Sequence, residues 1–559
     1  MKTLNFKSLL VAGFAASAIV SCKQDVVTLQ PPPTVTPTTP TGSKGSVDFS
    51  KYVSIGNSLT AGFQAGALFT AGQQNSFPLI LSKQFSYAQG TTITFNQPDI
   101  NSVNGYNSSY SNPGAGVLRG RLILFAADGV QAHAVPTPAG ATGVPSPYNT
   151  ADLPTAYTGD KSKLNNFGVP GILLGQCLDN RLGNPTAGIY YNALYARFAS
   201  NPGTSTIITD ALATQPTFFT FDLGNNDVLG YATTGGDGSI PITDAAQFTG
   251  YYQTAIGALM TNTSAKGVVA TIPYVTTIPF FLTIKYNAIP LDATTAAQLM
   301  SAAAFGGYNQ IMTGIAAAMT ASPATFGLNA AQAAAISAEM ATRHVNYTAS
   351  TSNQILISDE TLVDMGPFFD ALVGLPPANG GITSAQRAGL EPYRKIRQAN
   401  SSDLITLTAG AVLGTLADPN NPLSVQGVAL PLADKYVLIP SEQLAIKTAV
   451  DAYNTTIKNT AASFSTRIAV ADINAAFTSF VTNQFIFQDV VTLTPNFSPP
   501  TGAFSEDGVH PNSRGYAYMA NIFIDAINGK TEFGAVVPKA SLADYGAVGL
   551  PWGPNGIIH

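Results

Sequence analysis

Short apolar runs recur along the chain, and most are closed by a residue that favours a turn. Residues 52–55 and 218–223 each end at a glycine, 268–272 ends at a proline, and 467–473 follows a stretch of helical periodicity at 441–460. Continuous apolar runs of this length predict buried parallel strands. Strands that alternate with helices favour an α/β layered domain with a mainly parallel sheet.

A different apolar pattern lies between the first two of these strands. Residues 122–126 and 130–135 are rich in apolar side chains, and Asp128-Gly129 separates them. Because Asp-Gly between apolar runs favours a tight turn, we expect a strand, a turn and a second strand here.

The spacing of the later segments predicts an insertion. About 280 residues separate Asp227 from Asp507, more than two further βα units require. Within this stretch, 294–320 and 329–348 are Ala-rich with helical periodicity, and Asn329 is placed to cap the second helix. We expect a mostly helical insertion that forms either a lid or wall of a substrate cleft, or a packing elaboration without a role in recognition. If it is a lid, deleting about 290–350 should change substrate preference.

These patterns divide the folded part of the chain into four segments. The core comprises 47–285 and 431–530, and the insertion comprises 286–430. The Gly/Pro-rich tail 531–559 is expected to wrap around the surface.

The N-terminus is typical of a targeting segment. Lys2 and Lys7 precede an apolar stretch at 9–20 that is too short to span a bilayer. Ile19-Val20-Ser21-Cys22 then resembles the bacterial lipobox, which predicts a lipoprotein signal peptide at 1–22 and a lipid on Cys22. An ordinary cleaved signal with a chance cysteine is the alternative. Residues 23–46 are rich in Pro and Thr and predict an extended tether.

Composition excludes several classes of protein. The formal net charge is −5 with no basic cluster, which argues against a nucleic-acid partner. Two cysteines are too few for a disulfide framework or a structural zinc site, so we expect neither. With Cys22 lipidated, Cys177 remains as a lone thiol, expected to be buried and inert.

Four separated segments carry residues suited to nucleophilic catalysis. In Gly56-Asn57-Ser58-Leu59, a strand ends in glycine and leads into a helix, which places Ser58 at the helix N-terminus. Free N–H groups at that position favour negative charge on a bound substrate. Alone, the segment better fits a capping serine in an ordinary turn.

His510 is the histidine with a motif around it. Asp507 lies three residues earlier and can reach the imidazole within one turn, fixing its tautomer. Glu506 is a less favoured candidate for the same role. No motif surrounds the other three histidines, His133, His344 and His559.

An acyl-transfer site also needs hydrogen-bond donors for the oxyanion. We expect the N–H groups of Ser58 and Gly171 and the side chain of Asn226 to supply them. Gly171 ends Asn166-Phe167-Gly168-Val169-Pro170-Gly171, and Asn226 lies in Gly224-Asn225-Asn226-Asp227. Asn226 alone would equally fit a loop asparagine.

In this order the four segments resemble blocks I, II, III and V of the SGNH/GDSL hydrolase superfamily, across about 47–285 and 430–530. The resemblance implies Ser58 as nucleophile, Asp507 and His510 as catalytic partners, and Ser58, Gly171 and Asn226 as the oxyanion hole. It also implies a three-layer α/β/α sandwich with a mainly parallel sheet. The chain departs from the family at Asn57, where block I carries an aspartate, so the charge balance near the serine differs.

The resemblance implies a serine esterase or lipase that needs no metal or organic cofactor. Its substrates would be lipid acyl esters or O-acetylated glycans, cleaved through an acyl-enzyme on Ser58. Since His510 must be neutral to accept a proton, activity should fall in acid. The enzyme would be exported and held by its lipid at the cell membrane or the outer membrane. The alternative is a catalytically inactive lipoprotein of the same fold that binds glycan or lipid.

Overall fold

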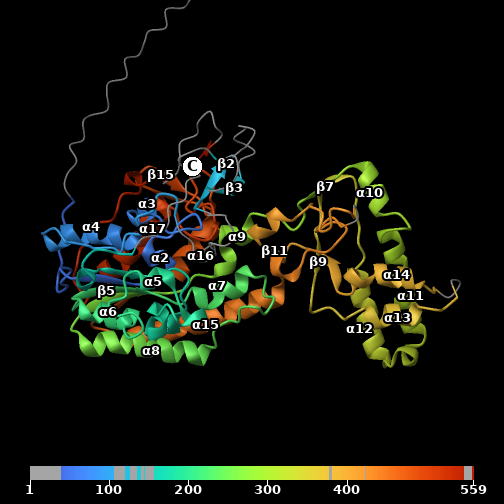
Figure 1. The fold of residues 1–559 in the computed structure, drawn as a ribbon, viewed down its shortest axis with the longest axis horizontal. Coiled ribbons are helices and arrows are strands. Elements are labelled where there is room, and N and C mark those ends of the chain that lie inside the picture. Colours follow the sequence, from blue (N-terminus) through green and yellow to red (C-terminus); the bar gives the residue numbers. More distant parts are fainter. Residues whose placement is uncertain are drawn as a thin grey trace, which may run out of the picture. The chain divides into compact units, whose positions relative to one another are not determined.

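The computed structural model describes residues 40–105, 120–125, 135–139, 144, 156–376, 380–421, 424–546 and 557–558 (Figure 1). The chain divides into two units, Met1–Pro40 and Thr41–His559, and the features below belong to the second. Cys22, His133, His559 and the Asp128-Gly129 turn lie outside the described residues.

A five-stranded parallel sheet forms the centre of an α/β body. Its strands lie in the order β13 (Ile468–Ala471), β6 (Lys266–Ala270), β5 (Phe218–Asp222), β1 (Tyr52–Gly56) and β4 (Asn166–Gly168). Numbered along the chain, this is the doubly wound order 2-1-3-4-5, which reverses direction at the first strand. The parallel strands expected from the apolar runs are confirmed.

Helices cover both faces of the sheet (Figure 1). On one side α17 (Ser513–Asn528) packs against α4 (Phe77–Gln89), β6 and β13. On the other lie α6 (Ile207–Ala213), α8 (Ala245–Asn262) and α15 (Pro440–Ala462), the helix predicted at 441–460. Because both faces are covered, every residue of β1 and of β5 is buried.

The residues from 284 to 439 form a lobe with its own hydrophobic core. Its helices are α10 (Ala293–Leu299), α11 (Phe305–Ala321), α12 (Ala330–Thr342), α13 (Gly366–Leu372) and α14 (Ser384–Gly389). Three two-stranded sheets accompany them: β7 (Ile289–Leu291) with β8 (Ser350–Asn353), β9 (Leu356–Ser358) with β10 (Ile396–Gln398), and β11 (Leu404–Ile405) with β12 (Val437–Leu438). The lobe core extends from Ile289 to Ile439, beyond the expected boundary at 430.

Two predicted helices differ from those observed. The single helix expected at 294–320 is two helices, α10 and α11. Carbonyl groups of the intervening segment lie against Gly306 and Gly307, where a Cβ would come within 2.4 Å and 2.2 Å of them. Asn329 caps α12 as predicted, with its side chain accepting from the N–H of Gln332, but this helix ends at Thr342 rather than 348.

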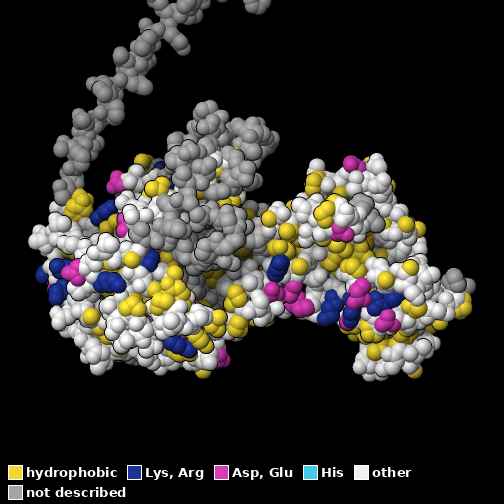
Figure 2. Space-filling view, in the orientation of Figure 1, with side chains coloured by type: hydrophobic (Ala, Val, Ile, Leu, Met, Phe, Trp, Pro, Cys, Tyr) yellow, Lys and Arg dark blue, Asp and Glu magenta, His cyan; other side chains and the backbone are white. Residues whose placement is uncertain are grey.

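The two strands of the expected hairpin pair with each other, with the second shifted along the chain, and the turn lies outside the described residues. β2 (Leu122–Phe125) pairs antiparallel with β3 (Val135–Pro138), which begins where the prediction ended. The tail also packs more closely than expected, since Phe533, Val537 and Leu542 are buried. Charged side chains are sparse on the face shown in Figure 2, as the 10% charged composition requires.

Candidate active site

Three side chains from opposite ends of the chain form one hydrogen-bonded row. The Ser58 hydroxyl oxygen lies 2.9 Å from Nε2 of His510, and Nδ1 of the same ring lies 2.8 Å from Oδ2 of Asp507. Ser58 is buried, and the side chains of His510 and Asp507 are 13% and 11% exposed. This geometry allows Ser58 to donate to His510 while the ring N–H donates to Asp507.

The turn after β1 fixes the position of Ser58. The side chain of Asn57 caps α2 (Ser58–Ala61) by accepting from the N–H of Leu59 at 3.0 Å. A Cβ at Gly56 would lie 2.0 Å from Oγ1 of Thr60 and 2.7 Å from the Asp222 carbonyl. Only glycine fits where the strand turns this closely into the helix.

Asp507 is held as a carboxylate. Its Oδ1 accepts from the backbone N–H groups of Val509 and His510, both at 2.8 Å, and its Oδ2 also accepts from the N–H of Gly66 at 2.7 Å. Burial would raise the pKa of this carboxyl, but the charge of protonated His510 and these donors together hold the pKa below its ordinary value. These contacts favour the carboxylate form of Asp507.

The loop around His510 is packed on two sides. The Phe63 ring lies 4.7 Å from the imidazole, and the hydroxyl of Ser505 donates to the His510 carbonyl at 3.0 Å. At Gly508, φ is +69°, and a Cβ would lie 3.0 Å from the N–H of Phe280 and 3.1 Å from Leu407. The imidazole is thus oriented by packing as well as by Asp507.

Among the described residues, no acceptor faces the two expected backbone donors. Neither the N–H of Ser58 nor that of Gly171 donates to another described residue. At Gly171 φ is +81° and no heavy atom lies within 4 Å of a Cβ position, so the backbone borders open space. Both groups can donate to a ligand oxygen.

The strand order brings Asn226 to the same edge of the sheet. Gly171 follows β4 and Asn226 begins α7 (Asn226–Thr233) after β5, and these strands flank β1. One N–H of the Asn226 amide donates to the Ile172 carbonyl at 2.8 Å, which leaves its other N–H available. Asp227 accepts from the N–H of Leu174 at 2.9 Å, so two contacts join these segments.

Asn57 places an uncharged amide next to Ser58, where an aspartate would place a carboxyl group. It is 1% exposed, and its Nδ2 has no partner among the described residues. Burial raises the pKa of the nearby Asp222, which pairs with Gly56 in the sheet, to about 7. An aspartate at 57 would add another buried carboxyl group here, whereas the amide adds no charge.

Sequence reasoning missed the supporting residues. Phe63, Gly66 and Ser505 carry no motif, and only their contacts in the folded chain reveal their roles. Glu506, the less favoured acid, makes no hydrogen bond with His510, and burial raises its pKa to about 7. His344 lies 3.4 Å from the Thr313 hydroxyl in the lobe, apart from this row.

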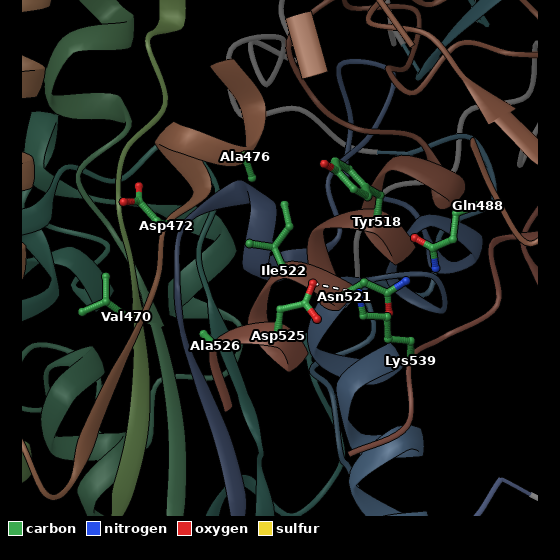
Figure 3. A pocket seen from close by; sticks show the side chains of 10 residues that line it. All are labelled: Val470, Asp472, Ala476, Gln488, Tyr518, Asn521, Ile522, Asp525, Ala526 and Lys539. Carbon is green, nitrogen blue, oxygen red and sulfur yellow. Dashed lines mark hydrogen bonds and ion pairs between the residues drawn. The ribbon is translucent and has the colours of Figure 1, made fainter. Parts of the chain in front are cut away.

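A pocket of about 300 Å³ lies elsewhere, between β13, α16 (Ile473–Asn483) and α17 (Figure 3). Asp525 and Lys539 form an ion pair at its edge, with 2.9 Å between Oδ2 and Nζ. Its lining does not include Ser58, His510, Asp507, Gly171 or Asn226.

A scan against protein-family models and searches of curated proteins and of solved structures found no match to this chain. The resemblance to a family therefore depends on the residues and geometry described above. Within the described residues, no helix is long and apolar enough to cross a membrane. Cys177 is buried with a free thiol, as predicted, and burial raises its pKa.

Proposed function

We propose that this chain is a serine esterase of the SGNH/GDSL type, with a three-layer α/β/α sandwich as its catalytic body. The supporting observation is the row from Ser58 through His510 to Asp507, with contacts of 2.9 Å and 2.8 Å. Its position at the carboxyl end of β1, where the strand order reverses, is where doubly wound sheets bind ligands.

In the acylation step, the hydroxyl oxygen of Ser58 attacks the ester carbonyl carbon, and its proton passes to Nε2 of His510. Asp507 stabilises the imidazolium that results. The N–H groups of Ser58 and Gly171 and the free N–H of Asn226 donate to the oxyanion. When the intermediate collapses, His510 returns the proton to the leaving alkoxide, and the alcohol departs.

Deacylation repeats these roles with water as the nucleophile. His510 accepts a proton from the water that attacks the acyl-enzyme, then protonates Ser58 as the carboxylic acid is released. Every proton transfer is made by His510, so the reaction requires no metal or organic cofactor.

The proposed substrates are lipid acyl esters or O-acetyl groups on glycans. We also propose export and lipidation on Cys22, with the Pro/Thr-rich residues 23–46 as a tether to the membrane. Mass spectrometry of the protein from its native membrane should find a lipid-modified Cys22 at the mature N-terminus. An unmodified Cys22, or a mature N-terminus elsewhere, would contradict this part of the proposal.

Steady-state hydrolysis of nitrophenyl esters of increasing acyl length tests the activity. We expect turnover by the natural protein and its loss in Ser58→Ala. Ser50→Ala, at an exposed serine just before β1, is the matched control and should leave the rate unchanged. Preference for acetyl or long-chain esters then separates the two substrate classes.

A well-folded natural protein that hydrolyses none of these esters would favour the binding alternative. Unchanged hydrolysis in Ser58→Ala would contradict the proposed nucleophile.

A further inference from the structure

Three carboxylates meet where the lobe joins the α/β body. Glu360 follows β9, Asp434 precedes β12, and Glu442 lies in the first turn of α15. One oxygen atom from each lies within 4.8 Å of the other two. Ca²⁺ takes oxygen ligands at about 2.3–2.6 Å, so three oxygens this close can surround one ion.

Glu442 is buried in this cluster and incompletely satisfied. It is 5% exposed, and its Oε2 accepts from the N–H of Ile439 at 2.7 Å. Among the described residues, neither its Oε1 nor the buried Oδ1 of Asp434 accepts from an N–H or O–H donor, and both side chains face the carboxyl group of Glu360. Buried carboxylate oxygens are normally paired or bound to a metal, so two such oxygens in one cluster favour a cation-binding site here.

In the described ranges, neither Lys nor Arg forms an ion pair with any of the three carboxylates. Lys395 donates instead to the backbone carbonyl of Glu360 at 2.8 Å, and Lys435 lies over the Tyr436 ring. Burial, together with the neighbouring carboxylates, raises the pKa of Glu442 to about 8 and also raises that of Asp434.

The backbone closes one side of the cluster. A Cβ at Gly236, in the turn after α7, would lie 2.2 Å from Oε1 of Glu442, and one at Gly235 would lie 2.3 Å from the Asp434 carbonyl. Both glycines have positive φ, +65° and +75° in chain order. The chain therefore encloses the carboxylates closely from the side of the α/β body.

We propose that Glu360, Asp434 and Glu442 bind a divalent cation through oxygen ligands, with Ca²⁺ as the ion of suitable size. The ion joins Glu360 and Asp434 of the lobe to Glu442 at the start of α15. Its role is structural, because none of the three residues belongs to the row around Ser58.

Isothermal titration calorimetry of the chelator-treated protein with CaCl₂ tests the site. We expect one Ca²⁺ per chain and a melting temperature that rises with added Ca²⁺. Glu442→Gln and, separately, Asp434→Asn should each weaken binding at least about tenfold. Glu391→Gln removes a charge from an exposed carboxylate in the same lobe and should bind as the natural protein does.

Two results would overturn the proposal. Absence of Ca²⁺ binding by the folded natural protein would show that the carboxyl groups share protons instead. If Glu442→Gln and Asp434→Asn both bind Ca²⁺ as strongly as the natural protein does, the ion binds elsewhere. Two variants are used because one of them could lose binding through misfolding. Melting curves without Ca²⁺ show whether each variant is folded.

Discussion

At the scale of single residues, the function of His510 depends on Asp507. Its carboxylate is acceptor-only, so it selects the tautomer with a proton on Nδ1 and leaves Nε2 able to accept from Ser58. In Asp507→Asn the amide N–H can donate to Nδ1 and favour the wrong tautomer. We expect kcat for ester hydrolysis to fall by about 10²–10⁴-fold while the melting temperature changes little.

Glu506→Gln is the matched control for Asp507→Asn. It removes the adjacent carboxyl group without touching His510, so the rate should stay within about twofold of natural. A larger loss in Glu506→Gln than in Asp507→Asn would reverse their assigned roles.

Asn226 contributes at the same scale through one N–H. Asn226→Ala removes the third oxyanion donor, and loss of one such donor lowers kcat by about 10²–10³-fold. KM should change much less, because the oxyanion forms only after substrate has bound. Steady-state kinetics separates the two constants, and a rise in KM with unchanged kcat would contradict the role. The Ile172 contact is lost as well, so a melting curve should accompany the kinetics.

At the scale of elements, the acidic start of α15 lowers stability as pH rises from 4.5 to about 8. The pKa of Glu442 is about 8 in the folded chain, against an ordinary value of 4.5. Below pH 4.5 the raised pKa leaves the free energy of unfolding unchanged, because Glu442 is protonated in both the folded and the unfolded chain. Between pH 4.5 and 8 the unfolded chain loses this proton first, so the free energy of unfolding falls as pH rises. Without divalent cations, Glu442→Gln should raise stability at pH 8 by about 1–3 kcal/mol and leave it unchanged at pH 4.

Melting curves at the two pH values measure this difference. Equal effects of Glu442→Gln at pH 4 and pH 8 would show that ionisation of Glu442 is not the cause. With Ca²⁺ bound, the stability of the natural protein should no longer fall between pH 4.5 and 8.

Elements were predictable where the apolar pattern was unbroken. The runs at 218–223 and 268–272 gave strands of the central sheet, because burial on both faces leaves a continuous apolar signal. Alanine gives no such signal, since it fits helix and connection alike, so the break between α10 and α11 was not visible at 294–320. That break depends on carbonyl groups of residues 300–302 that fold back locally against Gly306 and Gly307, which the alanine pattern does not reveal.

At the scale of the whole molecule, the lobe is attached through neighbouring strands. Ile284 and Val437 both pair with Ile405, so the two connections lie about 10 Å apart. Replacing 286–436 with a short Gly/Ser linker should leave a folded body in which a fluorophosphonate labels Ser58. Circular dichroism and labelling measure the outcome, and an unfolded product would show that the body needs the lobe.

Deleting only 290–350 should instead unfold the lobe. That segment contains α11 and α12, which share one hydrophobic core with β9 and β10. Cutting this core in half exposes its apolar remainder. Limited proteolysis should then cleave the residual lobe rapidly, whereas resistance to cleavage would contradict a shared core.

The residues of the candidate site were predictable from short local motifs. The residues that pack around them and hydrogen-bond to them were not. Asp507 and His510 lie three residues apart, so their contact follows from local geometry, and the strand ends indicated where Ser58, Gly171 and Asn226 would gather. The cluster of Glu360, Asp434 and Glu442 has no local signal, because sequence separations of 8 to 82 residues are closed only by the fold.

Covalent labelling of Ser58 tests the central claim most directly. The purified protein is treated with a fluorophosphonate, and intact-mass and peptide mass spectrometry locate the adduct. We predict one adduct per chain on Ser58, none in Ser58→Ala, and greatly slowed labelling in His510→Ala. A folded natural protein that stays unlabelled, or carries its adduct on another serine, would contradict the account.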